Sequence, residues 1–125
     1  MNVVDSSGWV EYLTDGANAR FFGSSIRDAE NLVIPTVRLY QVFKRVLLEL
    51  SEEKAPDAIG MMSFGKVVEL SREYAIEAAR LSTETKLAMA DSIILATARA
   101  HDATLWTQDN HFKDIEGVKY IEKKA

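Results

Sequence analysis

Val3-Val4-Asp5-Ser6-Ser7 (residues 3–7) opens the chain, and Thr104-Leu105-Trp106-Thr107-Gln108-Asp109 (residues 104–109) lies near its other end. Each stretch has the pattern of a short, apolar β-strand that runs out at an aspartate. In an open α/β sheet, ligands bind in the crevice beyond the carboxyl ends of the strands. Two carboxylates brought there from opposite ends of the sequence therefore predict a charged site that is assembled by folding. The ligand that converging carboxylates favour is a hard divalent cation such as Mg²⁺.

The composition fits one folded domain that spans residues 1–125. The chain is 47% hydrophobic and 27% charged, which is typical of globular rather than disordered proteins. It has no cysteine and opens without the basic flank and apolar core of a signal peptide, so we expect a reducing cytoplasm. No apolar run approaches the roughly 20 residues of a membrane helix, and we expect no membrane contact. The net charge of −4 means that binding to nucleic acid requires a local basic patch, a metal ion or a partner subunit.

Short apolar segments alternate with longer helical patterns. The segments expected to be strands are 2–4, 31–34, 67–70, 104–107 and 118–121. Helices are expected from residues 5–7 past Gly16 to Phe22, from 35–36 to Leu50, over 87–100, and from Ser71 with Ala75, Ile76, Ala79 and Leu81 facing inward. Residues 51–60 include Pro56 and are expected to hold a break or a further helix. This alternation predicts right-handed crossovers and an α/β fold, a three-layer α/β/α sandwich around a central, mainly parallel sheet.

A third acid, Asp91, lies in a helix that is otherwise small and apolar. Aspartate is a poor helix former and is costly to bury without a partner, yet this one shares a helix face with Leu95 and Ala98. Asp5 and Asp91 can each be interpreted instead as helix caps, and Asp109 as a turn residue. The three together favour a metal site, because neighbouring carboxylates raise one another's pKa until a cation neutralises them.

The chemistry gives a reason for such a site. Mg²⁺ or Mn²⁺ held by Asp5, Asp91 and Asp109 keeps several waters, and one of them, acidified by the metal, can attack phosphorus. Ser6 and Thr107 stand beside two of these acids. Their hydroxyls are expected to hold the carboxylates or a bound water in position, with capping or turn hydroxyls as the alternative.

Three stretches, in their order along the chain, carry a family resemblance. They are Val3-Val4-Asp5-Ser6-Ser7, Ala90-Asp91-Ser92-Ile93-Ile94-Leu95-Ala96-Thr97-Ala98 and Thr107-Gln108-Asp109-Asn110-His111-Phe112. Together they resemble PIN-domain proteins, and among these the VapC toxins of VapBC toxin–antitoxin pairs. The resemblance implies a PIN-like domain over residues 1–125 and a metal-dependent endoribonuclease that uses Mg²⁺ or Mn²⁺ at Asp5, Asp91 and Asp109. It also implies a homodimer, an RNA substrate and a cognate VapB-type antitoxin that blocks the site.

One position departs from that family. The family carries a glutamate early in the helix after the second strand, and Gln41 stands at the matching place in Thr36-Val37-Arg38-Leu39-Tyr40-Gln41-Val42-Phe43-Lys44. An amide can offer a carbonyl oxygen to a metal, but it supplies neither negative charge nor a base. Three explanations stay open: a natural member of low activity, an inactivating substitution, or compensation by another acid such as Asp114. Gln41→Glu is expected to raise Mn²⁺ affinity and RNA cleavage.

Two functions therefore stay open for this chain. The first is an endoribonuclease toxin whose activity is lowered by Gln41; its catalytic residues are Asp5, Gln41, Asp91 and Asp109. The second is a catalytically inactive PIN-like binding module that keeps the dimer and antitoxin contacts. The basic residues expected to contact RNA phosphates are Arg38, Lys44, Arg45 and Lys113, with an ordinary solvated face as the alternative. His111, two residues after Asp109, is expected to be a loop residue, with a contact to a phosphate as the alternative.

Overall fold

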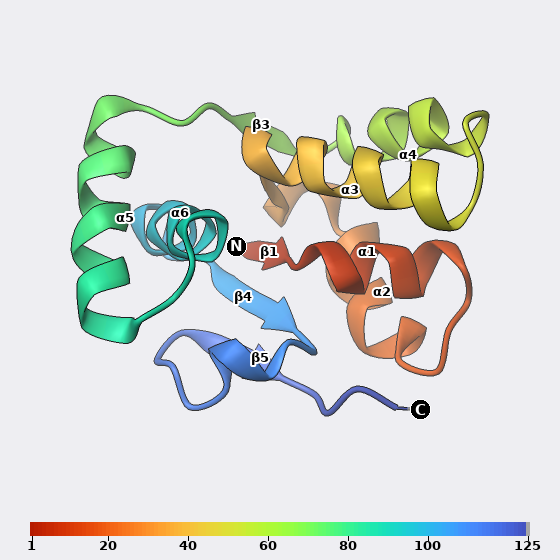
Figure 1. Ribbon diagram of the computed structural model, residues 1–125. Coiled ribbons are helices and arrows are strands. Elements are labelled where there is room, and N and C mark those ends of the chain that lie inside the picture. The colour runs from red at the N-terminus through yellow and green to blue at the C-terminus, as the bar shows by residue number, and fades with distance from the viewer. Residues whose placement is uncertain (125) are drawn as a thin grey trace.

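The computed structural model describes residues 1–124, and in this part of the chain five parallel strands form the centre of the molecule (Figure 1). The strands are β1 (Asn2–Val4), β2 (Val33–Pro35), β3 (Lys66–Val68), β4 (Thr104–Thr107) and β5 (Val118–Tyr120). Three of them pair in the order β1-β4-β5, and β2 pairs with β3. A parallel bridge between Asn2 and Leu32 joins the two groups, so the order across the molecule is β3-β2-β1-β4-β5.

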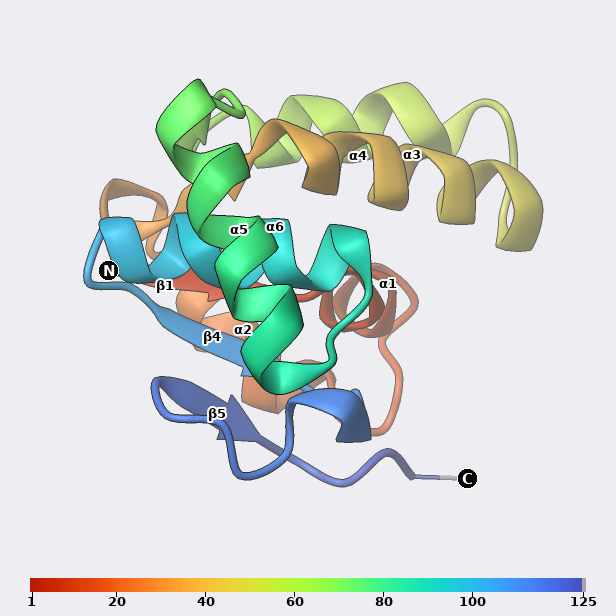
Figure 2. The same cartoon turned by 60° about the vertical axis from the view of Figure 1, so that its left-hand side comes forward.

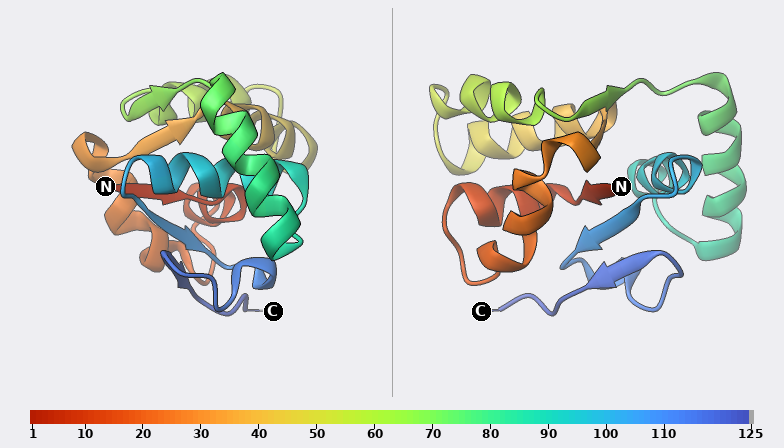
Figure 3. Two further views of the ribbon diagram at one scale, coloured as in Figure 1. Left: turned by 90° about the vertical axis from the view of Figure 1, so that its left-hand side faces the viewer. Right: turned by 180° about the vertical axis from the view of Figure 1, so that it is seen from behind.

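Helices cover both faces of these strands. They are α1 (Ser6–Leu13), α2 (Ala19–Arg27), α3 (Thr36–Glu49), α4 (Lys54–Met62), α5 (Arg72–Thr85) and α6 (Met89–Ala100). Seen from the front and from behind, α5 and α6 lie on one side of the strands, and α1 and α2 lie on the other (Figure 1 and Figure 3). Figure 2 shows α3 and α4 packed side by side. The predicted α/β fold with a parallel sheet between helical layers is confirmed.

The two faces of the sheet draw on alternate residues of each strand. Val3 belongs to the hydrophobic core that α5 and α6 cover, whereas Val4 belongs to the core on the side of α1 to α4. Strands that are buried on both faces need nearly continuous apolar sequence, which is the pattern that residues 2–4 have. Because β1 and β4 are parallel, their carboxyl ends meet at one edge of the sheet. Asp5 and Asp109 follow at that edge.

The long helix expected from residues 5–7 past Gly16 is wrong. Two helices stand there, because α1 ends at Leu13 and Asp15 takes a left-handed conformation with φ of 52°. The turn lets α2 fold back onto α1. Gly8 permits the close packing, since a Cβ at this position would lie 2.6 Å from the ring of Phe22. The short α1 thereby keeps its first turn at the edge of the sheet where Asp5 lies.

Residues 51–60 contain a further helix rather than a break. Pro56 lies in the first turn of α4, where its missing N–H leaves no helical hydrogen bond unmade. Among the described residues, no helix combines the length and the apolar character that crossing a bilayer requires.

The expected inward face of α5 is partly wrong. Ala78 and Leu81 are the buried residues of this helix. Ala75, Ile76 and Ala79 are exposed, and Ile76 keeps 52% of its surface accessible. The reason is that α5 is the outer helix of a pair and packs chiefly against α6, so that a narrow stripe is enough to bury it.

Candidate active site

Asp5 is the most buried acid of the expected site. It follows β1, its backbone N–H donates to the Trp106 carbonyl of β4 at 2.9 Å, and 5% of its surface is exposed. Although Asp5 precedes α1, its side chain accepts no capping hydrogen bond from the described backbone of that helix. Ser7 Oγ instead donates to Asp5 Oδ2 at 2.7 Å. The hydroxyl that holds this carboxylate therefore belongs to Ser7 and not to Ser6, which lines the pocket beside it.

Asp91 enters the same region from the opposite layer. It is the third residue of α6, whose N-cap position is Ala88, so the capping interpretation does not describe it. Burial raises the pKa of the Asp91 carboxyl, and the neighbouring charges of Asp109 and then Asp5 raise it further. Arg38 and His111 act in the opposite direction on that pKa. An acid in this setting is one that a bound cation would stabilise in its ionised form.

Asp109 completes the acidic group at the end of β4. Its backbone N–H donates to Thr107 Oγ1 at 2.9 Å, so the buried Thr107 hydroxyl holds the loop that carries the carboxylate. Asp109 Oδ1 accepts from the backbone N–H of His111 at 2.9 Å and lies 3.2 Å from His111 Nδ1. The turn role and the site role thus coincide in this one side chain. Ligand atoms of Asp91, Asp109 and His111 lie within 4.8 Å of one another.

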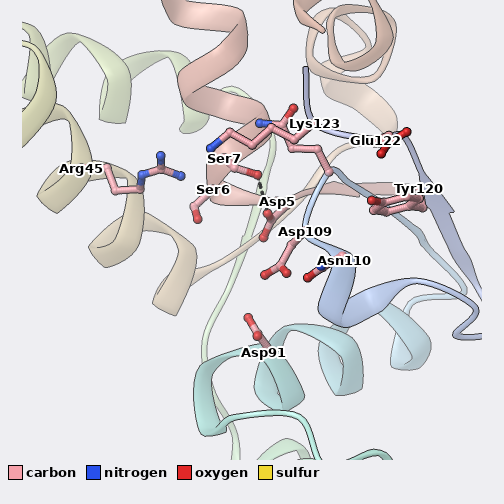
Figure 4. Close-up of a pocket in the computed structure, with 11 residues that line it drawn as sticks. Asp5, Ser6, Ser7, Arg45, Asp91, Asp109, Asn110, Tyr120, Glu122 and Lys123 are labelled. Atoms are coloured by element: carbon pink, nitrogen blue, oxygen red, sulfur yellow. Dashed lines mark hydrogen bonds between the residues drawn. The ribbon is translucent and has the colours of Figure 1, made fainter. Parts of the chain in front are cut away.

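These side chains surround one open pocket of about 510 Å³. Figure 4 shows Asp5 and Asp109 side by side, with Asp91 facing them from α6. The residues that line the pocket are Asp5, Ser6, Ser7, Arg45, Asp91, Gln108, Asp109, Asn110, Tyr120, Glu122 and Lys123. The three acids predicted from the sequence, Asp5, Asp91 and Asp109, therefore line one pocket. Asp5 follows β1, Asp109 follows β4, and Asp91 comes from α6.

The position of Arg38 differs from the one predicted. It was expected at an RNA-facing rim, but it is 1% exposed and its guanidinium points inward. Arg38 Nη1 lies 3.2 Å from Asp5 Oδ1 and donates to Oε1 of the half-buried Gln41. Burial lowers the pKa of Arg38, against the opposing effect of Asp5 and then Asp91, yet a guanidinium keeps its charge in proteins. Gln41 is thus brought next to the acids through Arg38 and does not line the pocket itself.

The family of the chain follows from a comparison with known protein families. The model of the PIN domain family matches residues 3–118. The chain belongs to the PIN domain family. No match was found among curated protein sequences.

Several solved structures with the same fold come from toxin–antitoxin systems. A toxin–antitoxin complex from Klebsiella pneumoniae is similar with a TM-score of 0.78 at 22% identity, covering 95% of this chain and 96% of that one. A sarcin–ricin loop cleaving VapC toxin of Mycobacterium tuberculosis has a TM-score of 0.76 at 12% identity, covering 93% and 95%. FitAcB from Neisseria gonorrhoeae has a TM-score of 0.73 at 16% identity, covering 98% and 97%. At these identities the likeness concerns the fold.

The donor set of this PIN domain fits one divalent cation on the side of Asp91 and Asp109. Two carboxylates and one imidazole offer oxygen and nitrogen ligands close enough to share an ion. On the other side of the pocket, Asp5 Oδ2 accepts from Ser7, and Asp5 Oδ1 faces the positive charge of Arg38. Asp114, considered as a compensating acid, is exposed in a turn with φ of 67°. Among residues 1–124 it is not a member of the group that could share an ion.

The remaining basic residues expected to contact RNA lie at different places around the PIN fold. Arg45 lines the pocket and pairs with Glu49 at 2.8 Å. Lys44 instead borders an apolar groove on α3 and α4, with its Nζ 5.9 Å from the centre of the Tyr40 ring. Lys113 is exposed and does not line the pocket. Lys123, which was not predicted, adds a cation to the rim (Figure 4).

Besides Ser7 and Lys123, three further contributors to the site were missed by sequence reasoning. His111 was interpreted as a plain loop residue, although its position two residues after Asp109 was the available signal. The other two form a buried polar contact: Asn18 Nδ2 donates to Gln108 Oε1 at 2.8 Å and to the Glu122 carbonyl at 3.1 Å. This contact ties the α1–α2 turn to the segment that carries Asp109. A polar Gln108 directly after an apolar strand was its only trace in the sequence.

Proposed function

We propose that this PIN domain is a metal-dependent endoribonuclease toxin of the VapC type. The observation that supports it best is that Asp5, Asp91 and Asp109 line one pocket at the carboxyl edge of a parallel sheet. Burial, and then the neighbouring charges of Asp109 and Asp5, raise the pKa of Asp91, so a divalent cation bound among these carboxylates would stabilise their ionised forms. Mg²⁺ or Mn²⁺ is the cation whose ligand preference matches this donor set.

The chain's own residues have distinct tasks in this function. Asp91 and Asp109, with His111 beside them, hold the divalent ion. When bound, such an ion supplies Lewis-acid activation of water and neutralises charge on phosphate oxygens. Thr107 fixes the backbone of Asp109 through its hydroxyl. Arg45 and Lys123, on the rim of the pocket, meet the phosphates that flank the scissile bond of the RNA.

Partners and setting follow from the same proposal. The neighbouring structures of Klebsiella pneumoniae and Rickettsia felis were solved as toxin–antitoxin and DNA-bound VapBC complexes, which supports a VapB-type antitoxin for this chain. An apolar groove on α3 and α4, lined by Leu39, Tyr40, Phe43, Lys44, Leu47 and Ile59, offers surface for protein contacts. A homodimer, a single domain over residues 1–125 and a cytoplasmic location belong to this proposal.

A second candidate function is favoured by one observation. The buried guanidinium of Arg38 neutralises the charge of Asp5, and Gln41 adds no negative charge that would replace it. A PIN-like module that binds its dimer and antitoxin partners without cutting RNA would show this arrangement.

Cleavage of a fluorogenic single-stranded RNA at saturating Mn²⁺ separates the two functions. The unmodified protein should cut, and Asp109→Asn and chelation of the metal should each abolish the signal. Asparagine keeps the side-chain oxygen that accepts from the His111 backbone, so Asp109→Asn tests the charge rather than the turn. Equal signals from the two purified proteins, or no signal from either, would reject the nuclease in favour of the binding module.

A further inference from the structure

Arg38 is placed by its position in α3. It is the third residue of the helix, directly after β2, so its side chain starts at the carboxyl edge of the sheet. Gln41 and Arg45 follow at three and seven residues, which puts all three on one helix face. Arg45 reaches the rim of the pocket, whereas Arg38 reaches its buried wall. The face of α3 toward the acids therefore carries two cations and a neutral amide.

We infer that the Arg38 guanidinium is a built-in cation of the acidic site, which neutralises Asp5 and so leaves Asp91 and Asp109 to hold a single, weakly bound divalent ion. The inference rests on the proposed function, since it assumes that this pocket takes a divalent ion. It assigns Arg38 as a positioning residue that sets metal affinity, without contact to the ion.

The contacts of Arg38 support this role. One donor, Nη1, serves both Asp5 and Gln41, while Nε and Nη2 are buried without a hydrogen-bond partner among the described residues. A guanidinium with so few neutral acceptors is not held in the interior by hydrogen bonds alone. The negative charge of Asp5, with that of Asp91 beyond it, is what offsets its burial. The cation and the acids are thus mutually dependent.

Gln41 fits the same arrangement. Its Oε1 accepts from Arg38 Nη1, so a carboxylate at this position would first pair with the guanidinium. Gln41→Glu alone is therefore expected to add little to metal affinity, which modifies the expectation drawn from sequence. Removal of Arg38 together with Gln41→Glu would free both Asp5 and the new carboxylate for a cation.

The test is a double-mutant cycle read by Mn²⁺ binding, measured by calorimetry and by the spin-resonance signal of free Mn²⁺. Arg38→Met removes the charge and keeps an unbranched stem, and Arg38→Gln is a second variant that retains a donor for Asp5. Each should bind Mn²⁺ at least about 10-fold more tightly than the unmodified protein, or roughly 1.4 kcal/mol. Gln41→Glu should change the affinity less than about threefold alone, and more than tenfold when added to Arg38→Met.

Arg45→Met is the matched control, because it removes one positive charge from the same helix face without touching Asp5. It should change Mn²⁺ affinity by less than about threefold, as expected for a solvent-screened charge. Equal gains from Arg38→Met and Arg45→Met would overturn the role of Arg38, because net charge would then explain them. Unchanged affinity in folded Arg38→Gln would overturn it as well. Absence of Mn²⁺ binding in every variant, the double variant included, would instead reject the metal site of the proposed function.

Discussion

Asp5→Asn should destabilise the metal-free protein, which is unusual for the removal of a carboxylate from an acidic cluster. Asp5 carries the charge that lies nearest to the buried guanidinium of Arg38, at 3.2 Å from its Nη1. Both side chains are almost inaccessible, with 1% and 7% of their side-chain surfaces exposed. Asparagine keeps the shape and can still accept from Ser7, so the substitution removes mainly the charge.

The size of the effect follows from that geometry. Two unit charges 3.2 Å apart attract by about 5 kcal/mol at an effective dielectric constant of roughly 20. Breaking a buried pair by removal of one partner costs about 3–5 kcal/mol in other proteins. Arg38 keeps its attraction to Asp91 and a neutral acceptor at the substituted position, which lowers the loss. We expect the free energy of unfolding to fall by about 2–4 kcal/mol, a large part of the 5–15 kcal/mol typical of a domain.

Urea unfolding in the presence of a chelator, followed by circular dichroism near neutral pH, measures this loss. For a slope of about 1.5 kcal/mol per molar urea, the midpoint should fall by roughly 1.3–2.7 M without a change in slope. Ser6→Ala is the control, because Ser6 lines the pocket beside Asp5 without a side-chain hydrogen bond to it among the described contacts. A variant as stable as the unmodified protein, or more stable, would refute the buried Arg38–Asp5 pair.

The other predictions concern Asp91 and the packing of α1. The raised pKa of Asp91 means that its ionisation opposes folding as pH rises above about 4, so Asp91→Asn should stabilise the metal-free protein near neutral pH, and its advantage should shrink as the pH is lowered toward 4. If the difference in unfolding free energy between the two proteins stayed constant across this pH range, the raised pKa would be contradicted. Gly8→Ala should destabilise by about 1–3 kcal/mol, because the added Cβ meets the Phe22 ring at 2.6 Å. Gly60→Ala, at a helical site with nothing within 4 Å, is its control and should be neutral or stabilising in the same thermal melts.

The sequence allowed the sheet edge to be predicted because the physical rule behind it is simple. Residues 2–4 and 104–107 are short stretches rich in apolar and β-branched residues, which favours strands, and parallel strands bring their following residues to one edge. The proximity of Asp5 and Asp109 could therefore be predicted from the sequence. Asp91 could be added because an aspartate in an apolar helix demands a partner.

Arg38 could not be predicted in the same way. Arginine is mostly exposed in proteins, so the general rule assigned it to a solvated rim. Its burial depends on a tertiary fact, namely that the first turn of α3 faces an excess of negative charge. The break between α1 and α2 was missed for a different reason. It depends on the left-handed conformation of Asp15 and on the close packing of Gly8 against Phe22. Hydrophobic periodicity, from which the helix was predicted, reports neither of these features.

The cation site itself is tested most directly by anomalous X-ray diffraction from crystals of the unmodified protein grown or soaked with Mn²⁺. We expect one manganese peak within coordination distance of Asp91 and Asp109, roughly 2.0–2.3 Å from their oxygens, while the Arg38 guanidinium remains against Asp5. Two results would contradict this expectation. One is a manganese ion bound to Asp5 with Arg38 displaced, and the other is no manganese at the acids after a soak at a high Mn²⁺ concentration.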